Sequence, residues 1–158
     1  MTANVCRQCS ADTTSIRLDR LAGEDGGVTI VIEGLPALDC ANGHKRFPTP
    51  DFPLEFLQQL TDTDGLLVAT PAVEKGLLKK KAHCPACKQK LPETPEGESR
   101  QRAEVAMPDG TPVMVELALP LFRCPGCQQE ATLPGSGMER GVMQAVANAF
   151  RSAEIPPG

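Results

Sequence analysis

The sequence predicts a small α+β fold of two similar β-hairpin units in tandem, each followed by an α-helix. Three observations predict it: seven cysteines that mostly form Cys-x-x-Cys pairs, an internal similarity at an offset of 84 residues, and frequent glycine and proline. The 158 residues include 15 prolines and 14 glycines, and the only aromatic residues are five phenylalanines. Short segments with few large side chains bury little apolar surface, so such units usually need a cross-link, either a disulfide or a metal ion.

The internal similarity is found by aligning the chain with itself at the 84-residue offset. Cys40 then falls on Cys124, and the segment GVTIVIEGLPALDC faces TPVMVELALPLFRC. A fixed offset of this kind is the mark of a duplicated unit, although a chance match of two β-rich stretches is the alternative. The predicted organisation is a first unit at residues 1–62, a connector at 63–82 and a second unit at 83–158.

Each unit is predicted to contain a β-hairpin. In the second unit, residues 103–107 and 111–119 flank an Asp-Gly pair, and Asp-Gly between β-prone runs is a strong hairpin signal. In the first unit, residues 15–19 and 28–33 are expected to pair across a longer glycine-rich turn at 23–27.

A helix is predicted after each hairpin. Asp51 can begin a helix over residues 52–60, and Ser136 and Glu139 have the spacing of a capping box at the start of a C-terminal helix. A further short helix is expected to begin near Thr70 in the connector. The C-terminal helix has an apolar stripe that consists of Met138, Val142, Met143, Val146 and Phe150.

The second unit carries two Cys-x-x-Cys turns that are typical of a zinc site. Zinc favours four sulfur or nitrogen ligands in a tetrahedron, and one Cys-x-x-Cys turn presents two sulfurs to the ion. Proline and glycine inside these turns suit a sharp bend whose backbone amides point at the sulfurs. The predicted ligands are Cys84, Cys87, Cys124 and Cys127.

The first unit has one such turn and a less regular partner segment. Gly43 stands where a fourth cysteine is expected, and His44 follows it. Imidazole is a good zinc ligand, and Cys-x3-His spacing is usual. His83 adjoins a turn that already has four sulfurs, so we expect it to be a flanking residue. The predicted ligands are Cys6, Cys9, Cys40 and His44, which gives two zinc ions per chain; the alternative is an exposed His44 beside an incomplete site.

Other uses of the cysteines are less favoured. The N-terminal sequence lacks a basic segment followed by an apolar one, so we expect a cytoplasmic protein in which paired cysteines more often bind metal than form disulfides. Iron sites of the rubredoxin kind are sheltered by aromatic side chains, and the chain has no tryptophan or tyrosine. Redox-active Cys-x-x-Cys pairs begin a helix, whereas polar or proline-rich sequence follows these pairs.

The first half resembles the zinc-finger domain of MqsA-type antitoxins. The residues that carry the resemblance are Cys6-x-x-Cys9, the run Val31-Ile32-Glu33-Gly34-Leu35-Pro36, and Cys40; Gly43-His44 departs from the pattern. The resemblance implies a zinc-dependent, mainly structural domain, without the DNA-binding helix-turn-helix, which has no evident counterpart here. The second half resembles a generic zinc ribbon with two Cys-Pro-x-Cys turns.

Three classes of function are compatible with two zinc ribbons. The net charge of −4 and the apolar helices favour a protein-interaction or adaptor module. A nucleic-acid-associated factor is the alternative, and the lysines that favour it are Lys79, Lys80, Lys81, Lys88 and Lys90. Thiol redox chemistry or metal handling is a more remote alternative. An enzyme is not expected, because the sequence has no HExxH motif, no phosphate-binding glycine loop and only two histidines.

Overall fold

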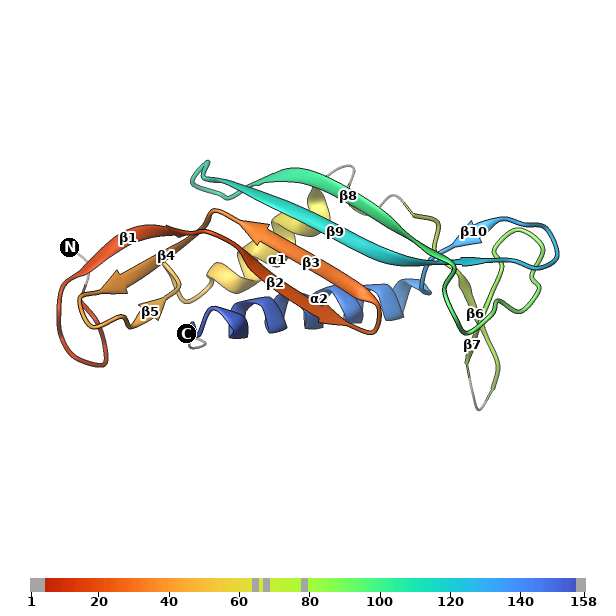
Figure 1. Ribbon diagram of the computed structural model, residues 1–158, viewed down its shortest axis with the longest axis horizontal. Helices are drawn as coiled ribbons and strands as arrows, with labels where there is room; N and C mark the ends of the chain where they lie inside the picture. The colour runs from red at the N-terminus through yellow and green to blue at the C-terminus, as the bar shows by residue number, and fades with distance from the viewer. Residues whose placement is uncertain (1–4, 64–65, 67–68, 78–79, 156–158) are drawn as a thin grey trace.

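The computed structural model describes residues 5–63, 66, 69–77 and 80–155, and within them the chain forms an elongated α+β fold with antiparallel sheets and two helices (Figure 1). This confirms the predicted fold class at the level of α+β. The strands are β1 Thr13–Leu18, β2 Leu21–Asp25, β3 Val28–Glu33, β4 Leu35–Cys40, β5 Lys45–Arg46, β6 Val73–Lys75, β7 Lys81–His83, β8 Gly97–Ala106, β9 Pro112–Arg123 and β10 Glu130–Ala131. The helices are α1 Phe52–Asp62 and α2 Gly135–Ser152.

The first hairpin is longer than the sequence predicts. β1 pairs with β4 and β2 pairs with β3 in a common register, from Thr13 opposite Cys40 to Asp25 opposite Val28, with a break at residues 19–20. The turn is only Gly26-Gly27, with φ of 56° and 88°, which glycine adopts without strain. The predicted turn at 23–27 is therefore wrong, and so is the predicted pairing of residues 15–19 with 28–33, because β1 pairs with β4 and β3 pairs with β2.

Gly23 explains that error, because it lies inside strand β2 rather than in a turn. A Cβ atom at this position would collide with the carbonyl oxygen of Ala145 and with the amide nitrogen of Ala149, both in α2. Glycine within a strand often marks the close approach of another backbone. Here it lets α2 lie directly on the sheet.

The second hairpin has its turn at the Asp-Gly pair, as the sequence predicts. β8 pairs with β9 from Gly97 opposite Leu121 to Ala106 opposite Pro112. In the turn between them, the Asp109 carboxylate accepts a hydrogen bond of 2.9 Å from the Thr111 amide. The paired strands extend beyond the predicted limits at the end away from the turn, whereas at the turn each strand is one residue shorter than predicted.

The two hairpins join through their second strands, β3 and β9, which pair antiparallel. Val31 lies opposite Glu116 and Ile32 opposite Val115. A shift of 84 residues exchanges these two pairs, so the pairing has the local two-fold symmetry expected of a duplicated unit. The duplication itself, and the division into units at residues 62 and 83, stay predictions.

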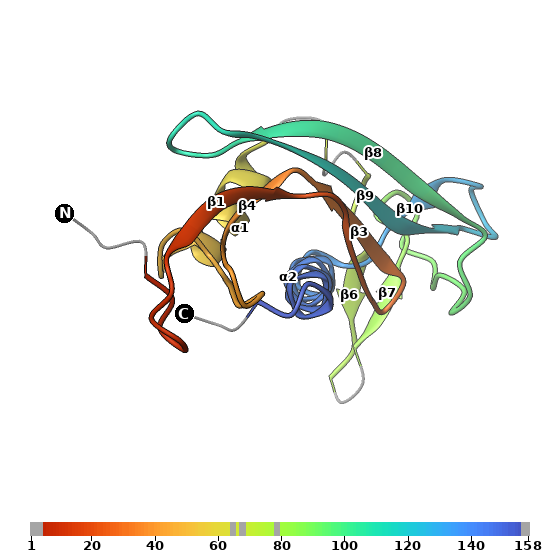
Figure 2. The ribbon, with the colours of Figure 1, turned by 60° about the vertical axis from the view of Figure 1, so that its left-hand side comes forward.

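Each helix packs on the hairpin of the other half. α2 packs on β2 and β3, and α1 contacts β8. The sheet curves around α2, which is seen nearly end-on in Figure 2. One cluster of buried side chains draws on both hairpins and both helices. An aromatic group of Phe47, Phe52, Phe56 and Phe150 joins the two helices, with ring centroids 4.9–5.8 Å apart.

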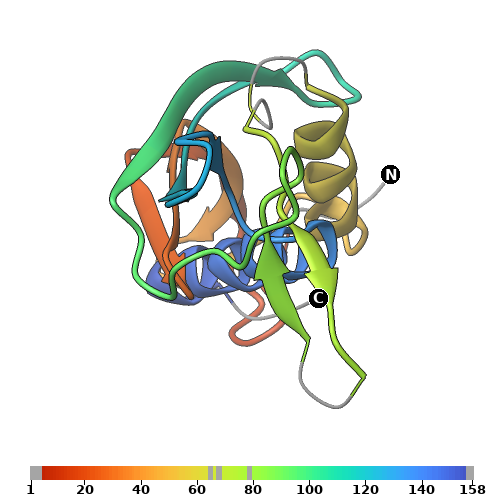
Figure 3. The same cartoon turned by 90° about the vertical axis from the view of Figure 1, so that its right-hand side faces the viewer.

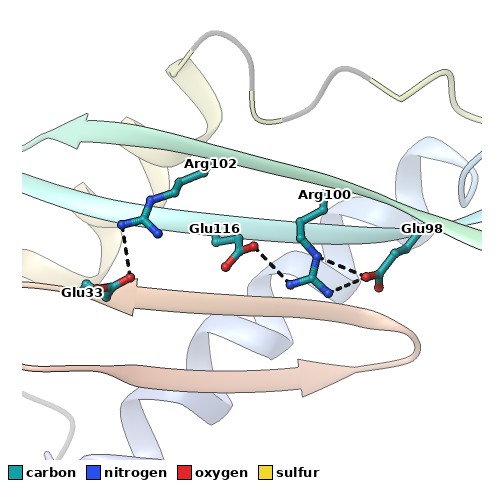
Figure 4. Close-up of polar contacts among 5 residues, drawn as sticks. All are labelled: Glu33, Glu98, Arg100, Arg102 and Glu116. Atoms are coloured by element: carbon teal, nitrogen blue, oxygen red, sulfur yellow. Dashed lines mark hydrogen bonds and ion pairs between the residues drawn. The ribbon is translucent and has the colours of Figure 1, made fainter.

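The outer face of the sheet is charged. Arg100 on β8 forms ion pairs with Glu98 on the same strand and, at 3.1 Å, with Glu116 on β9 (Figure 4). Arg102 reaches across β9 to Glu33 on β3 at 3.5 Å. Because side chains alternate between the faces of a strand, this charged face leaves the opposite face of the same strands to the apolar core.

Several local predictions can be compared with the structure. Asp51 precedes α1 as expected, although its side chain makes no capping hydrogen bond. The capping box is wrong, since α2 begins at Gly135 and the Ser136 hydroxyl donates to Glu74 Oε1 at 2.5 Å instead. The helix predicted near Thr70 is also wrong, because strand β6 occupies that segment. Within the described residues, neither helix combines the length and apolar character needed to cross a membrane.

Candidate metal centres

The structure brings the four cysteines of the second half together at one end of the molecule. The Sγ atoms of Cys84 and Cys127 are 3.6 Å apart, and those of Cys87 and Cys124 are 3.4 Å apart. All four sulfurs lie within 4.8 Å of one another. Zinc–sulfur bonds of about 2.3 Å in a tetrahedron place sulfurs about 3.8 Å apart. We call these residues the four-cysteine group, and their spacing is compatible with one bound metal ion.

The second group contains Cys6, Cys9, Cys40 and His44 and is called here the histidine-containing group. His44 Nδ1 lies 3.4 Å from Cys6 Sγ and 3.5 Å from Cys40 Sγ. Cys9 Sγ lies 3.7 Å from Cys40 Sγ. A tetrahedral zinc ion with one nitrogen ligand gives nitrogen–sulfur distances of about 3.6 Å. The imidazole therefore lies among the three sulfurs, where a fourth ligand is needed, rather than in an exposed loop.

Three of the four ligand-bearing turns share one backbone conformation. In each Cys-x-x-Cys turn, the residue after the second cysteine has a positive φ and donates its amide to the carbonyl of the first cysteine. These hydrogen bonds are Ser10 to Cys6 at 2.9 Å, Lys88 to Cys84 at 2.9 Å and Gln128 to Cys124 at 3.0 Å, with φ of 60°, 66° and 64° respectively. A left-handed residue that is not glycine costs about 1 kcal/mol, so this geometry is held by its surroundings.

The fourth turn is one residue shorter. Gly43 has a φ of 79° and donates its amide to the Cys40 carbonyl at 3.0 Å, so the left-handed position comes three residues after the cysteine instead of four. His44 follows that position, and its side chain is longer than that of cysteine. Glycine adopts this φ without strain, and the imidazole spans the remaining distance to the sulfurs.

Hydrogen bonds to the sulfurs favour the thiolate form at particular positions. The Asn42 side-chain amide donates to Cys9 Sγ at 3.2 Å and, with the Ala11 amide, lowers the pKa of Cys9 to about 6. In the other group, the Cys87 and Ala86 amides lower the pKa of Cys84 to about 6 against the effect of burial. Turn amides that point at sulfur thus prepare both groups for a cation.

The neighbouring sulfurs oppose full ionisation. The Gln129 amide lowers the pKa of Cys127, but burial and the adjacent sulfurs of Cys84, Cys87 and Cys124 outweigh it and raise that pKa to about 12. Four thiolates so close together repel one another, and a divalent cation would offset that repulsion.

The two groups lie at opposite ends of the long axis, one beside β4 and β5 and the other beside β7 and β10 (Figure 1). The four-cysteine group stands on its own small cluster of buried residues, which is separate from the main core and consists of Ala72, Cys84, Leu91, Cys124 and Ala131. Figure 3 views this end, where the ribbon of β6 and β7 projects from the rest of the fold. His83 belongs to neither group, and its Nδ1 lies 2.9 Å from the Lys81 carbonyl oxygen.

The predicted lysine cluster divides in the structure. Lys80, Lys81 and Lys90 line a surface pocket beside the four-cysteine group, whereas the Lys88 ammonium donates to the Pro85 carbonyl at 2.9 Å. Lys79 lies outside the described residues. The pocket was not predicted, because its apolar lining residues are far apart in the chain.

Comparison with known proteins gives no match: no family model fits the chain, and neither characterised proteins nor solved structures resemble it significantly.

Proposed function

We propose that this chain binds two zinc ions as structural cross-links and acts as a protein-interaction or adaptor module. The observation that carries the metal assignment is the spacing of the ligand atoms. Seven sulfurs and one imidazole nitrogen, drawn from segments far apart in sequence, gather into two sets of four within 4.8 Å. Such convergence of thiols without a disulfide is what a tetrahedral metal site requires.

Zinc is favoured over iron by the ligands of the histidine-containing group. Three thiolates and one imidazole form a common structural zinc site, whereas a mononuclear iron site of the rubredoxin kind takes four thiolates. The sequence also has no tryptophan or tyrosine that could shelter an iron site. The proposed content is therefore two zinc ions per chain.

A structural role is favoured over catalysis because each group already supplies four protein ligands. Catalytic zinc keeps a position for water or substrate beside three protein ligands. In both groups the fourth ligand atom lies within 4.8 Å of the other three. An adaptor role is the use proposed for these cross-linked ends, and the net charge of −4 favours a protein over a nucleic acid as the partner. The resemblance of the first half to zinc-finger domains of MqsA-type antitoxins supports the same structural use of zinc.

Metal analysis of the purified protein tests this proposal. We expect elemental mass spectrometry of the acid-digested protein to find two zinc ions per chain. For His44→Ala, which removes the proposed imidazole ligand, we expect one zinc ion per chain. His83→Ala is the matched control and is expected to keep both ions, because that imidazole lies outside the group. Iron in place of zinc, or two ions retained in His44→Ala, would overturn the assignment.

Nucleic-acid binding is the second candidate, and the lysines around the four-cysteine group favour it. Phosphate contacts dominate such binding and make it strongly salt-dependent. Retention on heparin at moderate salt, lost after charge reversal of Lys80 and Lys81, is the expected result for this candidate. Elution with the salt-free flow-through would exclude it.

A further inference from the structure

A surface pocket of about 530 Å³ lies beside the four-cysteine group. Its floor is apolar, with Leu91 buried and Phe122 and Leu133 half-buried. Its basic lining residues, here called the rim, are the exposed Lys80, Lys81 and Lys90. The lining segments come directly before and after the metal-ligating turns, so the shape of the pocket depends on those turns.

The positive charges of the rim are only partly balanced. Glu93 is the one acidic lining residue, and its carboxylate is 3.9 Å from the Lys81 ammonium in an exposed pair. Lys81 and Lys90 line the same pocket, and repulsion from the Lys81 ammonium lowers the pKa of Lys90. An anion bound between the lysines would offset that repulsion.

We propose that this pocket binds a short acidic peptide segment of a partner protein, with an apolar side chain on the floor and carboxylates on the three lysines. The inference rests on the proposed adaptor function and names the chemistry of the partner. A pocket of about 530 Å³ is large enough for one apolar side chain and its neighbours, and such pockets combine an apolar lining with few polar groups.

A peptide suits the pocket better than a nucleic acid. The apolar floor gives no benefit to a phosphate. Phe122 is half-buried and belongs to β9, which limits its use as a stacking platform for bases.

Binding of defined peptides to the zinc-loaded full chain tests this proposal by fluorescence anisotropy. The probe is a fluorescein-labelled peptide, Glu-Glu-Leu-Glu-Glu, and its controls replace the glutamates by glutamine or the leucine by alanine. We expect the acidic leucine peptide to bind and each control to bind more weakly. The double substitution Lys81→Gln, Lys90→Gln is expected to weaken binding about tenfold, because it removes two charge contacts.

Arg20→Gln is the control. Arg20 is exposed at the bend between β1 and β2, so this substitution removes one positive charge far from the pocket. Zinc content and circular dichroism establish that each variant is folded. The proposal is overturned if the glutamine peptide binds equally well or if the lysine variant binds like wild type. It is also overturned if a ten-nucleotide oligothymidylate binds more tightly with the same lysine dependence.

Measuring the zinc content alongside peptide binding distinguishes a failure of this inference from a failure of the proposed function. Chelation should abolish peptide binding, because the lining segments flank the metal-ligating turns. A protein with two zinc ions that binds none of the peptides would overturn the pocket proposal and leave the zinc assignment intact. A protein that is purified without zinc and still binds the acidic peptide would overturn the zinc assignment and leave the pocket proposal intact.

Discussion

The two ends of the molecule bear similar ligand groups but differ in what else holds them. At the histidine-containing end, Leu35, Ala37 and Phe47 belong to the main core, and Ile16 and Leu18 pack against it. At the four-cysteine end, the buried residues form a separate small cluster that includes two of the ligands themselves. One end is thus an extension of the core, whereas the other has little apolar packing beyond the four-cysteine group itself.

This difference shows how the importance of a metal for folding depends on its surroundings. Apparent binding free energies of structural zinc are about 10–16 kcal/mol, which far exceeds what a few buried alanines and one leucine supply. Where the metal is the main source of stability, removing it unfolds the element. Where apolar packing already holds the strands, removing the metal is expected to loosen only the turns that carry the ligands.

The largest effect is expected from Cys124→Ser, which removes a fully buried sulfur of the four-cysteine group. We expect loss of one metal ion and local unfolding of β6, β7 and β10, while the paired centres of β3 and β9 stay folded. Hydrogen exchange with mass spectrometry, combined with metal analysis, measures both results. Protection of β6 and β7 equal to that of wild type would contradict the dependence of this end on metal.

A smaller structural effect is expected from Cys40→Ser in the histidine-containing group. One metal ion is again lost, but exchange should rise mainly in the turns at residues 6–11 and 40–44, because β1 and β4 stay paired and packed on the core. The same exchange experiment compares the two variants directly. Equal unfolding of both ends would remove the contrast drawn between them.

Gly23→Ala tests the core on which the histidine-containing end depends. The new methyl group would collide with the backbone of α2, and we expect a loss of about 1–3 kcal/mol in the free energy of unfolding. Denaturant titration measures this loss. Gly97→Ala is the control, because open space surrounds that position at the end of β8, and it is expected to be nearly neutral. Both variants should keep two metal ions.

The smallest effect is expected from Arg17→Ala. The Arg17 guanidinium donates to the Gly34 carbonyl at 2.8 Å and to the Pro112 carbonyl, so it links the bend of the first hairpin to the second hairpin. The contacts are exposed, and we expect a loss of about 1 kcal/mol. In metal-free protein, hydrogen exchange of β1 should rise in this variant more than exchange of β8. Unchanged exchange of β1 would show that apolar packing alone holds this end.

Most of the ligand geometry was predictable because it is local. A Cys-x-x-Cys turn fixes two sulfurs within one short loop, and its spacing is visible in the sequence. The Asp-Gly hairpin and the helix after Asp51 were predictable for the same reason. The apolar stripe of α2 was right at Val142, Val146 and Phe150, which are buried, and wrong at Met143, which is 57% exposed.

The errors fall where a distant segment decides the local structure. Gly23 was interpreted as part of a turn, yet it lies in a strand because α2 packs on it. The residues after Thr70 were interpreted as a helix, yet β7 and Thr132 supply strand partners for them. Ser136 was interpreted as a cap, yet its hydroxyl bonds to Glu74.

The sequence by itself determined which eight side chains can bind metal, because the spacing of ligands within a turn depends only on the turn. It also determined the Asp-Gly turn of the second hairpin and the apolar stripe of α2 at Val142, Val146 and Phe150. Only the tertiary structure decided that β3 pairs with β9, that each helix contacts the opposite hairpin, and that three lysines surround an apolar pocket. These features depend on contacts between segments many residues apart, and no local pattern in the chain specifies such contacts.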